Sequence, residues 1–62
     1  MNRLKEIREE RNMSQVKLAE ISGITRQTIA KIESNPQANI KVDTLKKLAH
    51  ALSVEFYEIF LP

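Results

Sequence analysis

The chain has 62 residues, of which 42% are hydrophobic and 29% are charged, and its formal net charge is +2. A chain of this length is expected to form one small domain, residues 1–62, around a single core. It has no cysteine and one histidine, His50, so we expect no disulfide, metal site or cofactor. No apolar run approaches the roughly 20 residues that cross a bilayer, and the N-terminus lacks an apolar signal core. We therefore expect a cytoplasmic protein that does not interact with membranes.

Apolar residues recur at helical spacing along the chain, without the alternation that is typical of strands. The first helix is predicted over about residues 3–11, with Asn2 as a suitable cap at its start. Asn12 tolerates the left-handed conformation that ends helices. Ser14 is a favourable cap for a second helix over about residues 15–21.

Three further helices are predicted in the second half of the chain. The third covers about residues 25–33, with Thr25 as its cap, and an Asn-Pro dipeptide stops the helix soon afterwards. The fourth covers about residues 42–52, and Val42 is expected to pack over its start. The fifth covers about residues 55–60. The sequence therefore predicts an all-α domain of five helices.

Gly23 is the only glycine of the chain, and it lies between the second and third predicted helices. Two short helices joined by a turn of three or four residues with a glycine form the helix-turn-helix layout. Glycine suits this turn because the backbone must adopt a positive φ there. Ala19, four residues earlier, is small enough to let the two helices approach closely. The apolar side chains expected between these helices are Leu18, Ile24, Ile29 and Ile32.

The pattern Q-x-x-L-A-x-x-x-G-I-x-x-x-x-I-x-x-I-E over residues 15–33 resembles the helix-turn-helix of phage repressor and Cro proteins, also called the xenobiotic-response-element family. The pattern V-D-T-L-x-x-L-A-x-x-L over residues 42–52 resembles the same family. The resemblance covers nearly the entire chain and implies a compact lambda-repressor-like DNA-binding domain. Asn12 and Ser53 depart from the pattern, since the family often has glycine at both positions.

This resemblance implies that the third helix enters the major groove of duplex DNA, N-terminal end first. Arginine can donate to O6 and N7 of guanine, and glutamine can pair with N6 and N7 of adenine. The base contacts expected from these two considerations are Thr25, Arg26, Gln27 and Lys31. The expected contacts to the DNA backbone are Gln15, Thr28, Asn35 and Lys41.

The resemblance also implies an ion pair and a dimer. Arg8 of the first helix is expected to pair with Glu33 of the third, the alternative being that both side chains are solvated. The C-terminal run is unusually apolar, which favours association. The expected interface residues of a homodimer are Val54, Phe56, Tyr57, Phe60 and Leu61. A two-fold dimer favours a palindromic operator, and the alternative is a monomer.

The function expected from these features is a sequence-specific double-stranded DNA-binding transcriptional regulator, and more narrowly a repressor. The alternative is a protein-interaction module with the same fold, such as an antitoxin or anti-repressor component. Such a module could lose Arg26, Gln27 and Lys31, which this chain retains. An enzyme is not expected, because the chain has no cysteine, one histidine and no paired carboxylates in a plausible cleft. We therefore expect no small-molecule substrate.

Overall fold

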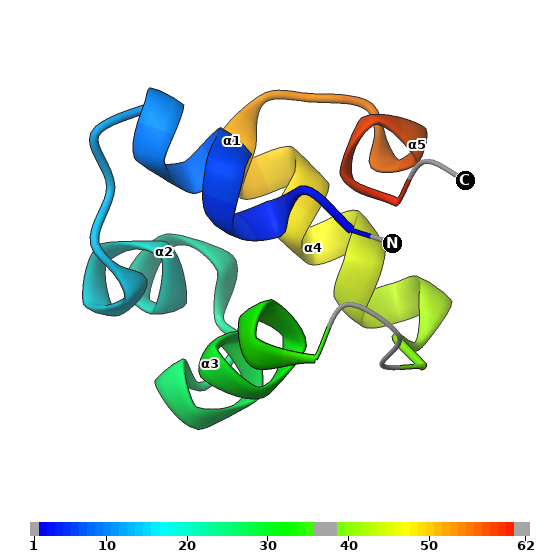
Figure 1. Ribbon diagram of the computed structural model, residues 1–62, viewed down its shortest axis with the longest axis horizontal. Helices are drawn as coiled ribbons and strands as arrows, with labels where there is room; N and C mark the ends of the chain where they lie inside the picture. The colour runs from blue at the N-terminus through cyan, green and yellow to red at the C-terminus, as the bar shows by residue number, and fades with distance from the viewer. Residues whose placement is uncertain (1, 36–38, 61–62) are drawn as a thin grey trace.

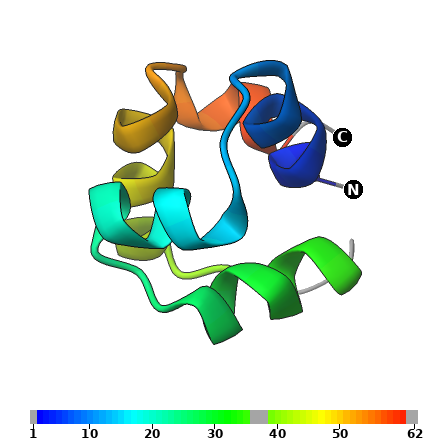
Figure 2. The same cartoon turned by 90° about the vertical axis from the view of Figure 1, so that its left-hand side faces the viewer.

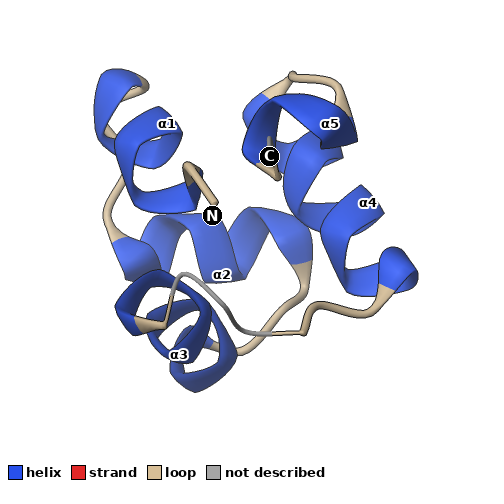
Figure 3. Ribbon diagram, turned by 45° about the vertical axis from the view of Figure 1, so that its right-hand side comes forward, coloured by secondary structure: helices blue, strands red, loops and turns tan. Residues whose placement is uncertain are grey.

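A computed structural model gives the arrangement of the chain and describes residues 2–35 and 39–60 (Figure 1). These residues form five helices and no strand (Figure 3). The helices are α1 (Leu4–Glu10), α2 (Gln15–Ser22), α3 (Arg26–Ser34), α4 (Val42–Leu52) and α5 (Phe56–Ile59). The predicted all-α fold is confirmed, and each predicted helix end lies within one residue of the observed end.

Three helix ends are followed by a residue in the left-handed backbone region. Asn12, Gly23 and Ser53 have φ angles of 57°, 77° and 58°. At the end of α2, the backbone N–H of Gly23 donates to the carbonyl of Ala19 at 2.9 Å. The left-handed turn therefore closes α2 with a hydrogen bond and redirects the chain toward α3.

Two hydroxyl side chains begin the helices of the motif, as the sequence predicts. The Ser14 hydroxyl accepts a hydrogen bond from the backbone N–H of Lys17 at 3.0 Å. The Thr25 hydroxyl accepts one from the backbone N–H of Thr28 at 3.2 Å. Each bond satisfies a donor that the first turn of a helix leaves without an intrahelical partner.

Two details at the helix starts differ from the sequence prediction. Arg3, not Asn2, is the residue that precedes α1, and its side chain makes no capping hydrogen bond. The Asn2 side chain nevertheless accepts a hydrogen bond from the backbone N–H of Leu4 at 3.2 Å. The prediction that Val42 packs over the start of α4 is wrong: Val42 is 64% exposed, because the first position of that helix points away from the core.

All five helices contribute to one hydrophobic core. In the described part of the chain, α2 contacts both α3 and α4, while α1 contacts α3 and α4 contacts α5. Each buried aliphatic side chain contributes about 1.5–3 kcal/mol through the apolar surface it removes from water. The buried apolar residues are Leu4, Ile7, Leu18, Ile29, Ile32, Leu45, Leu48, Ala49, Leu52 and Ile59.

The packing leaves α3 at one edge of the molecule. It lies at the bottom of each view, whereas α5 lies at the top (Figures 1, 2 and 3). α2 lies above α3 in Figure 2 and packs against it, and the turn between them joins the two helices at one side. The outer face of α3 is therefore left uncovered by the other helices.

None of the helices in residues 2–35 and 39–60 has both the length and the apolar character needed to span a membrane.

Candidate nucleic-acid interface

α3 has one buried and one exposed face. Ile29 and Ile32 point into the core, where Ile29 is fully buried and Ile32 is 5% exposed. The spacing of three residues between them is that of one helix face. The exposed residues at the start and along the outer face of the helix are Thr25, Arg26, Gln27, Thr28 and Lys31. All four expected base contacts therefore share the exposed surface of one helix.

The exposed face of α3 carries positive charge only. Arg26 and Lys31 are the only charged residues between positions 23 and 32. Glu33, the acidic residue near the end of the helix, has its side chain only 4% exposed and paired with Arg8. The outer surface of α3 is therefore suited to a polyanion, which is attracted by a local cluster of one sign of charge.

The hydroxyls of Thr25 and Thr28 are hydrogen-bonded to each other at 2.8 Å, with Thr25 as the donor. The Thr25 oxygen also accepts from the backbone of Thr28. Thr25 thus uses its hydroxyl hydrogen within the protein, and its methyl group is what it can offer to a base. Thr28 keeps its hydroxyl hydrogen, which can be donated to a phosphate.

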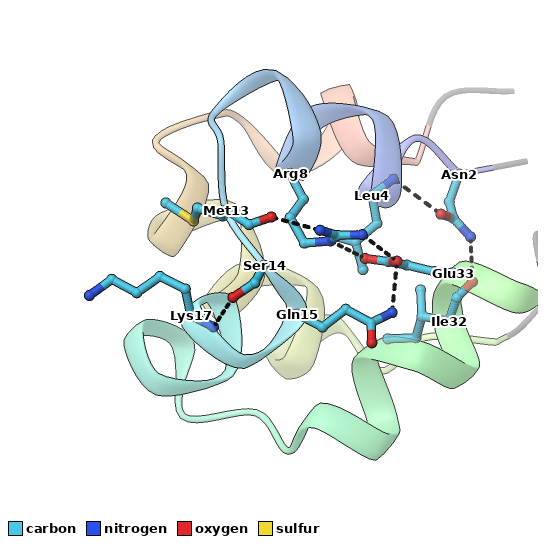
Figure 4. A network of polar contacts seen from close by, with 9 residues as sticks. All are labelled: Asn2, Leu4, Arg8, Met13, Ser14, Gln15, Lys17, Ile32 and Glu33. Atoms are coloured by element: carbon cyan, nitrogen blue, oxygen red, sulfur yellow. Dashed lines mark hydrogen bonds and ion pairs between the residues drawn. The ribbon is translucent and has the colours of Figure 1, made fainter.

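Arg8 and Glu33 form a two-point ion pair between α1 and α3 (Figure 4). The Arg8 Nε donates to Glu33 Oε2 at 2.7 Å, and the Nη2 donates to Oε1 at 3.0 Å. The Nη1 donates to the carbonyl of Met13 at 2.6 Å, in the segment before α2. The hydrogen bond to Glu33 raises the pKa of Arg8 above its usual value. One guanidinium group thus joins α1, the approach to α2, and α3.

Gln15 belongs to the same network. Its Nε2 donates to Glu33 Oε1 at 3.1 Å, so this side chain spans from α2 to α3 (Figure 4). The expected role of Gln15 is a phosphate contact, and its amide nitrogen retains a second hydrogen for that purpose. The backbone N–H groups at the start of α2 lie beside it. Gln15 therefore combines an internal bond with a donor near a positive helix end.

The second flank of α3 faces the segment that leads into α4. Lys31 from α3 and Lys41, which precedes α4, line one groove. The other residues that line it are Thr28, Ile32, Asn39, Ile40 and Thr44. Asn35, also expected near the DNA backbone, is exposed directly after α3. The groove brings together two positive charges from segments separated in sequence.

An apolar surface lies on α5, at the opposite end of the molecule from α3. Phe56, Tyr57 and Phe60 are 49%, 55% and 40% exposed. The rings of Phe56 and Tyr57 meet edge to face, with centroids 6.1 Å apart. Val54 is half-buried against the core, so it contributes less to this surface than the aromatic residues do. Leu61, the remaining expected interface residue, lies outside the described residues.

Two contacts between a side chain and a distant backbone carbonyl had no signal in the sequence. The Asn2 Nδ2 donates to the carbonyl of Ile32 at 3.2 Å, and the Arg11 Nε donates to the carbonyl of Leu52. Helical periodicity shows which side chains face inward. It does not show which distant backbone carbonyl a polar side chain reaches. The Gln15–Glu33 bond was missed for the same reason.

Metal-ligating side chains do not gather in the part of the chain that the structure describes. There, no group of three or more His, Cys, Asp or Glu residues is arranged to hold a metal ion. Two acidic residues are engaged in ion pairs: Glu33 pairs with Arg8, and Asp43 lies 3.4 Å from the Lys47 ammonium group. The candidate site is therefore a surface of donors, with hydroxyl, amide and cationic groups.

Comparison with known proteins agrees with this architecture. No curated protein sequence matches the chain significantly. A solved structure, the N-terminal DNA-binding domain of the master biofilm-regulator SinR from Bacillus subtilis, is similar, with a TM-score of 0.85 and 30% sequence identity. The similarity covers 97% of this chain and 87% of that chain. A family model described as helix-turn-helix matches residues 4–59. The chain therefore belongs to the helix-turn-helix family of the phage repressor and Cro type.

Proposed function

We propose that the chain is a DNA-binding transcription regulator that reads the major groove of double-stranded DNA with α3. The exposed, positively charged face of α3, held by buried residues on its other side, is the observation that supports this most. An α-helix fits the major groove, where each base pair displays its own set of donors and acceptors. The similar SinR structure is itself a DNA-binding domain, which supports the same proposal.

The proposed base contacts lie on the first turns of α3. Arg26 is assigned to the O6 and N7 atoms of a guanine, and Gln27 to the N6 and N7 atoms of an adenine. Thr25 places its methyl group against a thymine methyl, because its hydroxyl hydrogen is used within the protein. Lys31, four residues after Gln27, lies on the same helix face and contacts a base or a nearby phosphate.

The proposed contacts to the DNA backbone flank α3. Gln15 and the start of α2 bind a phosphate on one flank. Lys41 and Asn35 bind phosphates on the other flank, and Thr28 donates its hydroxyl beside them. Such contacts set the position of the protein on the duplex and carry no sequence information themselves. They are expected to make the affinity strongly dependent on salt.

The regulator is proposed to act as a homodimer on a palindromic operator. The exposed aromatic residues of α5 supply an apolar surface for a second copy. To read two half-sites one turn of DNA apart, a two-fold dimer needs its two copies of α3 about 34 Å apart on the same side of the duplex. Binding of such a dimer over a promoter would repress transcription by excluding polymerase.

The experiment that tests the proposal is selection of bound duplexes from a random DNA pool, followed by binding measurements at several salt concentrations. We expect one palindromic consensus, and an affinity that falls with a log–log slope of about −0.9 per phosphate contacted. A chain that retains no duplex at low salt would contradict the proposal. That result would favour the alternative, an antitoxin or anti-repressor component whose partner is a protein.

A further inference from the structure

Asn2 connects the start of the described chain to the far end of α3. Its Nδ2 donates to the carbonyl of Ile32 at 3.2 Å, across 30 residues of sequence. Its Oδ1 accepts from the backbone N–H of Leu4 at 3.2 Å (Figure 4). The side chain is half-buried. One amide group therefore bridges the first turn of α1 and the last turn of α3.

Both bonds satisfy backbone groups that helix ends leave without intrahelical partners. The last backbone hydrogen bond of α3 runs from the N–H of Asn35 to the carbonyl of Lys31, so the carbonyl of Ile32 lies beyond the helical hydrogen bonds. The N–H of Leu4, at the first position of α1, is in the same situation. Asn2 thus makes these bonds without competing with the hydrogen bonds inside either helix.

The neighbouring residue ties the same segment to α5. The backbone N–H of Arg3 donates to the carbonyl of Ile59 at 2.6 Å. Asn2 and Arg3, which we call the N-terminal strap, therefore contact α3 through a side chain and α5 through the main chain. The helix with the proposed base contacts and the helix with the proposed dimer surface share this connection.

The last turn of α3 is held at two successive residues. The strap binds the carbonyl of Ile32, and Arg8 binds the side chain of Glu33. The proposed base contacts begin at the other end of the helix, which has nine residues and is about 13 Å long. A tilt of about 5° at the anchored end would move the reading end by about 1 Å. This exceeds the range of 2.7–3.2 Å, about half an ångström wide, over which such hydrogen bonds form.

We infer that Asn2 is a positioning residue for the reading helix: it fixes the angle of α3 and thereby the base preference of the protein. The inference rests on the proposed function, because only a helix that reads DNA has a base preference to lose. Asn2 acts through Ile32 and is not assigned a contact with DNA.

The variant that tests this is Asn2→Ser. Serine keeps a short neutral acceptor for the N–H of Leu4, but it has no amide donor and does not reach the carbonyl of Ile32. Asn2→Asp keeps an acceptor of the same length and also lacks the donor. The control is His50→Gly, an exposed site on α4 where glycine lowers stability through helix propensity without touching the end of α3.

Selection from the same random DNA pool gives the first measurement. We expect Asn2→Ser and Asn2→Asp to alter the base preference and to weaken binding to the wild-type site by about two- to tenfold, the equivalent of one hydrogen bond. His50→Gly should keep the wild-type preference. If Asn2→Ser keeps the wild-type preference as well, the inference is overturned.

Amide hydrogen exchange gives a second measurement that needs no DNA. In Asn2→Ser, the amides of the last turn of α3 should exchange about two- to tenfold faster relative to those of α2 and α4. In His50→Gly, any increase in the exchange rates should not be concentrated in the last turn of α3. A uniform change in Asn2→Ser would overturn the inference. If the wild-type chain selects no duplex, the proposed function fails, while the exchange comparison still decides whether Asn2 positions α3.

Discussion

Glu33 accepts hydrogen bonds from side chains of two other helices, Arg8 of α1 and Gln15 of α2. Both members of the ion pair are largely removed from water, with side-chain exposures of 10% for Arg8 and 4% for Glu33. Desolvation of two charges opposes their attraction, so such a pair need not add net stability. Its clearer effect is geometric, because a bidentate contact allows few orientations.

Removal of one member of this pair is expected to be costly. Glu33→Ala leaves the Arg8 guanidinium buried without its carboxylate, and a loss of about 3–5 kcal/mol in the free energy of unfolding is expected. The whole domain has only about 3–9 kcal/mol available at this size. Urea denaturation followed by circular dichroism would measure the loss.

The matched control for this prediction removes both charges. Arg8→Met combined with Glu33→Leu should recover most of the stability that Glu33→Ala loses, since no charge is left buried without a partner. A double variant as unstable as Glu33→Ala would show that the loss has another cause.

Arg26 is expected to discriminate between bases. Arg26→Ala should weaken binding to the selected operator by about 1–3 kcal/mol and relax the preference at one base pair. Lys46→Ala is the matched control, because it also removes one exposed positive charge, on α4. Fluorescence anisotropy with single-base operator variants would measure both. Equal weakening on every sequence would reassign Arg26 to a phosphate.

At the scale of the elements, the sequence predicted the helices well because local rules determine their ends. Ser14 and Thr25 cap helices where the pattern places them, and Gly23 has the positive φ that the turn requires. Contacts between elements were less predictable. Asn2 reaches Ile32, and Gln15 reaches Glu33, because packing brings together groups that no local pattern relates.

The left-handed turns give a prediction for stability. A Cβ at Gly23 would meet no atom within 4 Å, so Gly23→Ala should cost only the backbone strain of a positive φ, about 1–2 kcal/mol. Ser53 already bears a Cβ at a φ of 58°. Ser53→Gly should therefore stabilise the protein, by up to about 1 kcal/mol. Thermal unfolding should give a lower melting temperature for Gly23→Ala and a higher one for Ser53→Gly. Destabilisation by Ser53→Gly would contradict this account of the α4 end.

At the scale of the whole molecule, α3 and α5 lie at opposite ends of a small domain (Figure 2). The proposed dimer through α5 leaves the outer face of α3 uncovered, and it must bring both copies of α3 onto the same side of one duplex. The aromatic residues on this surface could be identified from the sequence, but helical spacing alone does not show which residue of so short an apolar run is buried. Ile59 occupies the core position and leaves them outside.

Association through α5 is tested by one aromatic residue. Tyr57→Ser should raise the dissociation constant of the dimer and lower the affinity for a palindromic operator. Ile21→Ser is the control, because Ile21 is also an exposed apolar residue, at 48% against 55% for Tyr57, but lies on α2. Sedimentation equilibrium would measure the association. A wild-type chain that is monomeric both free and on DNA would contradict the proposed dimer.

The most direct test of major-groove reading by α3 is methylation interference on the selected operator. Dimethyl sulfate modifies N7 of guanine in the major groove and N3 of adenine in the minor groove. The proposal predicts interference at guanine N7 in two half-sites about one helical turn apart, and loss of one guanine signal per half-site in Arg26→Ala. Interference confined to adenine N3, or an unchanged guanine pattern in Arg26→Ala, would contradict it.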